Sequence, residues 1–193
     1  RNGFDVFGKK TTEIALPEVG LDGYDSYHEM ADWGADILKV GQSLGTGGYG
    51  YWDGTRTILV SDVAQRSVSI IADGPVYSAF DIEYSGWNTE TTTTDLTARL
   101  AMQAGSPMVD VDLDTTERLD NLAIGIVAHP TAELIVGDLD VTGEAWSYVA
   151  TFGPQTLFDD HLGIAVLFRK RDLVEQTRDE QSHVLVMQPR GTT

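Results

Sequence analysis

Hydrophobic and polar residues alternate along much of the chain. In residues 76–84 the alternation places two sets of side chains on opposite faces: Val76, Ser78, Phe80, Ile82 and Tyr84 on one, and Tyr77, Ala79, Asp81 and Glu83 on the other. A period of two is that of a half-buried β-strand. Residues 108–114 repeat the pattern, with Val109, Val111 and Leu113 expected to face the core and the intervening aspartates to face water. Both segments are therefore predicted to be strands.

Turn residues separate these runs at short intervals. Asp53-Gly54, Asp73-Gly74-Pro75 and Gly105-Ser106-Pro107 are typical of hairpin or loop turns. Further strands are expected at 67–72, 91–102, 122–128, 133–136, 145–151, 163–168 and 184–187. Strands spaced by roughly ten residues predict an all-β antiparallel sandwich with at most one or two short helices. No repeat or linker divides the sequence, so 1–193 is predicted to be one sandwich domain.

Two segments leave the secondary structure open. Residues 28–44 carry apolar side chains at helical spacing, but three glycines weaken a helix there. A short helix or turn followed by a strand is the alternative. Residues 170–181 are charged throughout, which favours either a solvated loop or a helical excursion.

The charge balance excludes some partners. Thirty acidic residues face thirteen basic ones, giving a formal net charge of −17. A nucleic-acid backbone or an anionic membrane would be repelled, because binding to phosphates requires Lys and Arg. No apolar run approaches the roughly 18 residues of a membrane helix. Such composition occurs in proteins of salt-loving organisms and in ordinary acidic secreted proteins. The absence of cysteine excludes disulfides and thiolate chemistry.

Two motifs match only superficially. Residues 45–50 fit GxGxxG, but 51–54 read as strand and turn where a dinucleotide site needs a helix. These glycines are expected to serve a tight turn or a close backbone approach. The aspartates of 108–114 lack the calcium-loop pattern and fit a solvated strand face. The four histidines show no metal-binding spacing, so neither a metal nor a cofactor is predicted.

The densest cluster of chemically useful side chains lies between residues 24 and 39. Tyr24 and Trp33 are candidates to stack on a sugar ring, whose C–H faces are apolar. His28, Asp32 and Lys39 are the candidate catalytic residues, because imidazole ordinarily titrates near neutral pH and carboxylates and amines complete an acid–base set. The alternative is an aromatic loop in which His28 is structural. We expect this segment to border an open concave surface.

Three residues elsewhere are further candidates for substrate binding. Trp52 could stack on a sugar, and Arg56 could hold a carboxylate or simply pair with Asp53 at the rim. His129 could project into a cleft or be a plain turn histidine. Trp87 and Trp146 fit either the core or a sugar platform.

Several stretches resemble the DUF4861 family of bacterial proteins. They are RNGFDVFGK at 1–9, VGLDG at 19–23, YHEMADWGADILKVGQSLGTGG at 27–48, and the shorter GPV and YSGW at 74–76 and 84–87. The resemblance implies a galactose mutarotase-like β-supersandwich in secreted or periplasmic proteins associated with polysaccharide breakdown. It also implies that residues 1–193 are part of a longer protein. His28, Asp32, Trp33 and Lys39 lie within the most distinctive of these stretches.

The leading functional hypothesis is a lyase or hydrolase acting on uronate-containing oligosaccharides or polysaccharides. His28 would be the general acid or base, Lys39 or Arg56 would neutralise the substrate carboxylate, and Trp33 or Trp52 would stack on the ring. The net charge of −17 opposes an anionic sugar, which favours a neutral one. A non-catalytic carbohydrate-binding module and a structural domain are the alternatives.

Overall fold

The computed structural model describes residues 2–21, 25–141 and 143–188. These residues form antiparallel β-sheets and three short 3₁₀ turns, with no α-helix among them. The predicted all-β, antiparallel fold class is therefore confirmed. The chain divides into two compact units, one made of Val60–Asp120 and the other of Asn2–Leu59 with the chain from Asn121 onward. The galactose mutarotase-like form and the single domain stay predictions.

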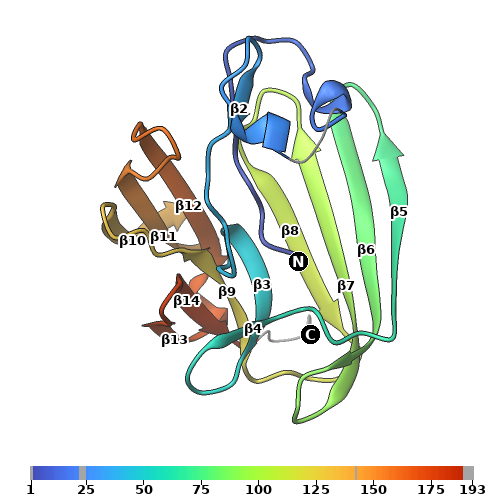
Figure 1. Ribbon diagram of the computed structural model, residues 1–193. Helices are drawn as coiled ribbons and strands as arrows, with labels where there is room; N and C mark the ends of the chain where they lie inside the picture. Colours follow the sequence, from blue (N-terminus) through green and yellow to red (C-terminus); the bar gives the residue numbers. More distant parts are fainter. Residues whose placement is uncertain (1, 22–24, 142, 189–193) are drawn as a thin grey trace. The chain divides into compact units, whose positions relative to one another are not determined.

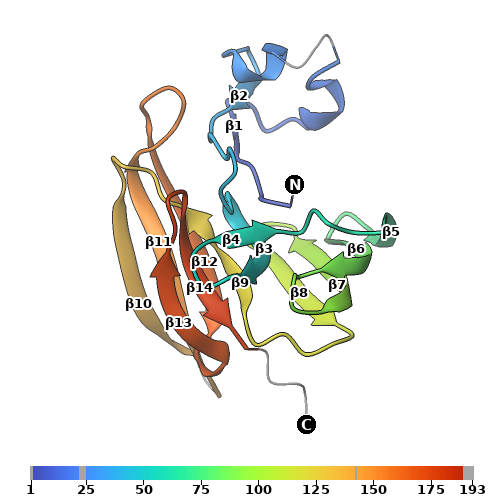
Figure 2. The ribbon, with the colours of Figure 1, turned by 60° about the horizontal axis from the view of Figure 1, so that its bottom comes forward.

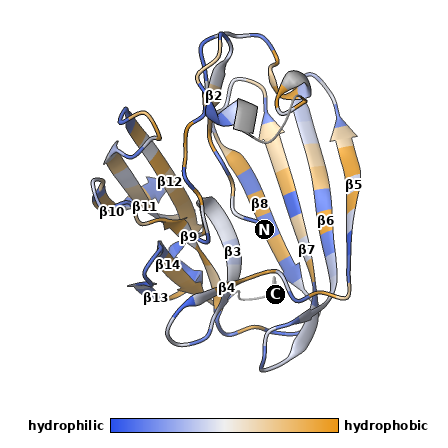
Figure 3. Ribbon diagram, in the orientation of Figure 1, coloured by the Kyte–Doolittle hydropathy of each residue, from blue (hydrophilic) through white to orange (hydrophobic). Residues whose placement is uncertain are grey.

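The unit Val60–Asp120 is a four-stranded meander (Figure 1). Its strands are β5 (Gln65–Asp73), β6 (Tyr77–Asn88), β7 (Thr93–Gln103) and β8 (Val109–Thr115). Their register places Ile82, Ala98 and Leu113 side by side on one face. Arg99 and Asp81 form a bidentate ion pair on the other face, with both N–O distances 2.7 Å. Figure 3 shows the alternation along these strands from which they were predicted.

The second unit contains a five-stranded sheet in the order β13-β14-β9-β3-β4. Its strands are β3 (Thr46–Trp52), β4 (Thr57–Leu59), β9 (Leu122–Val127), β13 (Leu173–Arg178) and β14 (Ser182–Met187). Leu44, Ala123, Val184 and Val186 form a buried cluster on this sheet. Gly45 has a φ of +59°, and a Cβ there would lie 2.3 Å from the carbonyl oxygen of Phe4. A close backbone approach, rather than a nucleotide, explains this glycine.

A three-stranded sheet forms the second layer of this unit. Its strands are β10 (Glu133–Val141), β11 (Glu144–Pro154) and β12 (His161–Arg169), in sequential order. Strands β11 and β12 pack against β9, and β12 also contacts β3 (Figure 2). Val149, Ile164 and Phe168 are buried on the inner side. Together the two sheets make the predicted sandwich.

A small lobe extends from the sandwich of the same unit (Figure 2). It contains β1 (Phe7–Lys9), η1 (Leu16–Glu18), η2 (Asp25–His28) and β2 (Gly34–Asp36). The backbone N–H of Leu157, in the loop after β11, donates to the carbonyl of Ile37 at 2.8 Å. That loop is braced by buried Gln155, whose amide donates to the carbonyl of Leu162 at 2.7 Å. The lobe is thereby attached to the sandwich.

Two sequence expectations are decided by the structure. Residues 28–44 form no helix, and the alternative of a short helical turn followed by a strand is confirmed by η2 and β2. Both interpretations of 170–181 were incomplete, because η3 (Lys170–Asp172) leads into strand β13. Strand β13 is the edge of its sheet and pairs only with β14. An edge strand tolerates charged, exposed side chains, which hides its alternation.

Candidate acid–base site

Pairing of β1 with β2 creates the candidate site. Phe7 lies opposite Asp36 in the antiparallel register, and the N–H of Ile37 extends the ladder by donating to Val6 at 2.9 Å. A tight turn at 31–34 precedes β2, with the N–H of Ala31 donating to Gly34 at 2.9 Å. Because β2 directly follows this turn, the end of η2 comes to lie next to the buried side of β2.

His28 meets a buried carboxylate at this point. Its Nε2 lies 3.3 Å from Oδ2 of Asp36, whose side chain is only 4% exposed, whereas the imidazole is 31% exposed. The other carboxylate oxygen of Asp36 accepts the backbone N–H of Leu38 at 3.2 Å. A carboxylate held in this way fixes the orientation of the imidazole.

Asp5 adds a second carboxyl group. Partial burial of the Asp5 carboxyl group raises its pKa from an ordinary 3.8 to about 6, and the charge and hydrogen bond of Asp36 add to the rise. The backbone N–H of Val6, which donates to Asp5 at 2.8 Å, and the charge of His28 oppose it. Two carboxyl groups in contact cannot easily both ionise, so Asp5 keeps a proton into mildly acidic pH. His28, Asp36 and Asp5 thus form a proton-sharing group, which we call the acid–base cluster.

Aromatic rings continue from the acid–base cluster. The ring of Tyr27 lies 4.2 Å from that of His28 between centroids, and Phe7 follows at 6.0 Å from Tyr27. Trp33 stacks on Phe7 at 6.2 Å with an interplanar angle of 29°. The structure therefore brings His28 and Trp33 into one assembly, with Phe7 and Tyr27 between them.

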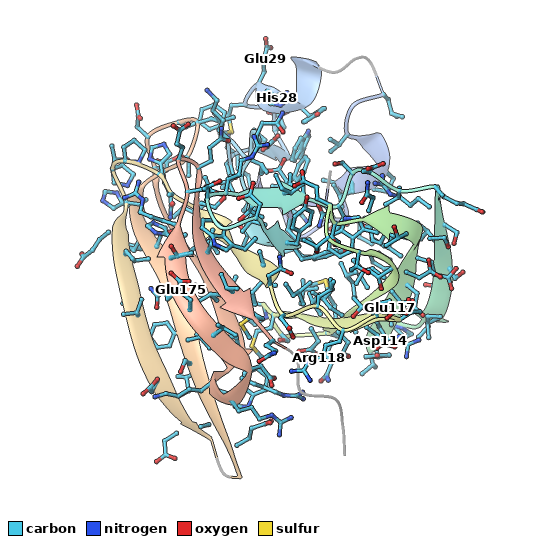
Figure 4. The ribbon with its side chains drawn as sticks, turned by 90° about the horizontal axis from the view of Figure 1, so that it is seen from below. His28, Glu29, Asp114, Glu117, Arg118 and Glu175 are labelled. Carbon is cyan, nitrogen blue, oxygen red and sulfur yellow. The ribbon has the colours of Figure 1, made fainter. Side chains whose placement is uncertain are left out.

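The other predicted residues of this segment differ in their surroundings. Asp32 and Lys39 are exposed, and neither forms an ion pair or hydrogen bond with the part of the chain that is described. Tyr24 lies outside the described residues. Figure 4 shows Glu29, next to His28, projecting away from the lobe. The acid–base partner of His28 is thus Asp36, not a neighbour in sequence.

The remaining predicted residues belong to other parts of the unit. Trp52 packs against the buried cluster of the five-stranded sheet. Arg56 pairs with Asp53 at 3.5 Å, in agreement with the rim alternative. His129 lies in the loop after β9, where its Nδ1 is 2.8 Å from the hydroxyl of Thr131. These contacts give Trp52 and Arg56 structural partners and favour the turn interpretation of His129.

Two further observations bear on where a ligand could bind. Trp87 is fully buried, so it belongs to the core and is not a platform for a sugar. A depression of about 480 Å³ lies at the β10–β11 hairpin, lined by Asp138, Leu139, Asp140, Gly143, Glu144 and Ala145. It includes no residue of 24–39. Within the described ranges, no group of three or more His, Asp or Glu residues is arranged to hold a metal ion.

Sequence reasoning missed Asp5 and Asp36. Asp36 lies among Ala35, Ile37 and Leu38, and an acid in an apolar run indicates a buried carboxylate that needs a partner. Asp5 belongs to the RNGFD stretch but has no such signal. Only the pairing of β1 with β2 shows that the two meet.

The Asp5→Asn variant should be more stable than the wild-type protein at pH 7, by about 1 kcal/mol after allowing for solvent screening of an exposed residue. The folded protein holds the Asp5 proton up to about pH 6, while the unfolded chain releases it near 3.8. The favourable contribution of this group is therefore complete below pH 3.8 and is lost as the pH rises to about 6. Asparagine can donate to Asp36 without ionising.

Urea unfolding at pH 4 and pH 7 checks this expectation. The gain of Asp5→Asn over wild type should be larger at pH 7 than at pH 4, and Asp32→Asn, an exposed acid of the same lobe, should show no such gain. An Asp5→Asn variant that is less stable at both pH values would contradict the shared proton.

Comparison with known proteins identifies a family but no characterised relative. Neither the curated proteins nor the solved structures include a match to the chain. None of the helices in the described ranges is long and apolar enough to cross a membrane. One family model, described as a domain of unknown function (DUF4861), matches residues 1–193. The chain therefore belongs to the DUF4861 family.

Proposed function

We propose that this protein is a carbohydrate-active enzyme that cleaves uronate-containing oligosaccharides or polysaccharides by β-elimination. The contact of His28 with the buried carboxylate of Asp36, which itself interacts with Asp5, carries the proposal. A partly exposed imidazole backed by a buried carboxylate is an arrangement used for proton transfer to and from a substrate.

The spacing of the carboxyl groups favours elimination over hydrolysis. A two-carboxylate glycosidase needs its acids about 5–9.5 Å apart, on either side of the scissile bond. Asp5 and Asp36 instead share a hydrogen bond, so no glycosidic bond fits between them. Elimination at a uronate needs a single base next to the sugar carboxylate, a role that suits His28.

The proposed elimination begins and ends with a proton transfer at His28. The neutral imidazole of His28 takes the C5 proton of the uronate. The C–H electron pair forms a C4–C5 double bond while the C4–O bond breaks. The imidazolium then returns the proton to the released oxygen. Asp36 stabilises the imidazolium between these events.

Lys39 is the favoured partner for the substrate carboxylate. It is exposed, follows β2 in the chain, and makes no ion pair with the described residues. Arg56 is less suited because Asp53 already pairs with it. Three of the four lysines, Lys9, Lys10 and Lys39, belong to residues 2–39, so the lobe has cations to offer in a chain of net charge −17. Trp33 and its ring neighbours would support the sugar. Because such polymers lie outside the cell, we propose a secreted or periplasmic location.

Product analysis of the wild-type protein tests the reaction. Oligogalacturonides, alginate and glucuronate-containing oligosaccharides would be incubated at high ionic strength, which screens the repulsion between protein and sugar. Elimination yields an unsaturated, ultraviolet-absorbing end, whereas hydrolysis yields only new reducing ends. The same preparation of His28→Ala is the blank for contaminating enzymes. Absence of unsaturated products with all of these substrates would refute the proposal.

A further inference from the structure

The outer side of the three-stranded sheet carries aromatic residues of one strand in a row. Along β11, Ser147, Val149 and Thr151 are buried against the sandwich, so Trp146, Tyr148 and Phe152 lie on the opposite side. The pairing of β11 with both neighbours is continuous, without a bulge, from one end of this row to the other. The three residues therefore share one face. We call this surface the outer aromatic face: Gly137 of β10, Trp146, Tyr148 and Phe152 of β11, and Gly163 and Arg169 of β12.

Glycines on the flanking strands let two rings lie low. A Cβ at Gly137 would be 2.7 Å from Cε1 of Tyr148, so the phenol ring crosses the bare backbone of β10. A Cβ at Gly163 would be 3.4 Å from Cδ2 of Phe152. Larger side chains at these positions would push the rings outward. The glycines thus help to keep this part of the face shallow.

Trp146 is covered by a cation that is already neutralised. The guanidinium of Arg169 lies 5.7 Å from the ring centroid of Trp146, and its Nε is 3.3 Å from a carboxylate oxygen of Glu144. Arg171 also pairs with Glu144, at 3.4 Å. At the other end, His161 lies 5.6 Å from Phe152 between ring centroids. The face therefore has polar groups at both ends of its row of rings.

The dimensions of the row suit an extended ligand. At about 3.3 Å per residue, Trp146 and Tyr148 are ~7 Å apart along the strand, and Phe152 is a further ~13 Å away. Phe152 is 51% exposed and Leu167, beside Tyr148, is 42% exposed. A ligand that covers the row must be long, shallow and apolar on the side it presents.

A polysaccharide strand has these properties. Each pyranose ring presents apolar C–H faces to aromatic rings and keeps its hydroxyls at the edges for polar neighbours. Nucleic-acid bases also stack on aromatic rows, but the net charge of −17 opposes their phosphates. Arg169 is paired with Glu144 and so is not free to receive a sugar carboxylate. A neutral polymer therefore suits this face better than an anionic one.

We propose that the outer aromatic face binds a neutral polysaccharide strand through the ring faces of its sugars. This site is separate from the acid–base cluster and does not depend on the reaction proposed there. It would hold the protein on a glycan surface, whether or not that glycan contains the bond that is cleaved.

Affinity electrophoresis in native gels tests the proposal, because the acidic protein migrates well without denaturant. Gels would contain xylan, glucomannan or mixed-linkage β-glucan, with polygalacturonate as the anionic comparison. Wild type should be retarded by at least one neutral polymer. Tyr148→Ala and Phe152→Ala, the latter removing a 51% exposed ring, should each weaken the binding up to about ten-fold, the value of one aromatic contact. Tyr77→Ala, which removes a 43% exposed tyrosine of β6, is the matched control and should bind like wild type.

Tyr148→Leu separates sugar stacking from general apolar docking. Leucine keeps an apolar side chain over Gly137 and so protects the fold, but it removes the flat ring. Retardation should fall in Tyr148→Leu as in Tyr148→Ala. The proposal is overturned by wild-type mobility that no neutral polymer changes, by variants that bind like wild type, or by retardation with polygalacturonate alone. Self-association in size-exclusion chromatography that is lost in Phe152→Ala would also overturn it, by showing that this face binds a second copy.

Discussion

Removing the imidazole of the acid–base cluster should lower kcat by about 10²–10⁴-fold, the usual contribution of a general acid or base. His28→Ala takes away the proton-transferring group and should leave KM for the oligosaccharide nearly unchanged, because the ring stack remains. Asp36→Asn should lose a similar factor. The asparagine amide turned toward Nε2 cannot stabilise an imidazolium and favours the wrong tautomer.

The pH at which Asp5 titrates distinguishes this role of Asp36 from a merely structural one. Burial, the largest cause of the raised Asp5 pKa, remains in Asp36→Asn, but the charge of Asp36 is lost, so the Asp5 pKa should fall from about 6 only part of the way toward its ordinary value. NMR titration of the Asp5 carboxyl should show this change directly. Asp32→Asn is the matched control and should retain turnover. If Asp32→Asn loses as much turnover as Asp36→Asn, the sequence-based choice of Asp32 is right and the acid–base cluster is not the site.

The fold was predictable because its signal is local. Alternation at 76–84 and 108–114 predicted two strands, and β6 and β8 confirm them. The buried side agrees only in part, because Ala79 and Asp81 are buried while Phe80 and Val109 are 39% and 43% exposed. Strand β13 escaped because the signal vanishes where both sides of an edge strand meet water: Val174 is 58% exposed. The turn and strand within 28–44 were left open because their glycines weaken a helix without indicating what replaces it.

The site was predictable only in part, because its contacts are not local. His28 and Trp33 were found from the density of functional side chains in one segment. Their partners come from β1, which contains Phe7, and from Asp5 just before it. The register of β1 against β2 cannot be predicted from the sequence of either strand alone. The outer aromatic face illustrates the same limit. Trp146 was ambiguous between core and platform until the buried positions of β11 fixed which side it faces.

The lobe and the sandwich contribute differently to the proposed activities. Three strands with a buried side give the outer aromatic face a rigid base, so its binding should survive changes in the lobe. The acid–base cluster rests on two three-residue strands, and short pairings of this kind open easily. The reaction should therefore be the more sensitive of the two to backbone substitutions between residues 5 and 38.

Gly34→Ala should abolish turnover and cost about 3–5 kcal/mol of the stability of the lobe, in the range of severe single substitutions. Gly34 has a φ of +132°, and a Cβ there would lie 1.8 Å from the carbonyl oxygen of Gly8. Because the obstacle is backbone, it cannot rotate away, and β1 must separate from β2. Asp36 would then lose its place beside His28 and Asp5.

Gly54→Ala is the control for the strain of a positive φ alone. Gly54 has a φ of +100°, but nothing lies within 4 Å of its would-be Cβ, so the variant should lose only about 1 kcal/mol and keep its turnover. Hydrogen exchange gives a readout independent of any substrate. The amides of Ile37 and Lys10, which donate across the β1–β2 ladder, should lose protection in Gly34→Ala, while those of β11 and β12 keep it. Equal protection of Ile37 in Gly34→Ala and wild type would contradict the β1–β2 pairing on which the acid–base cluster depends.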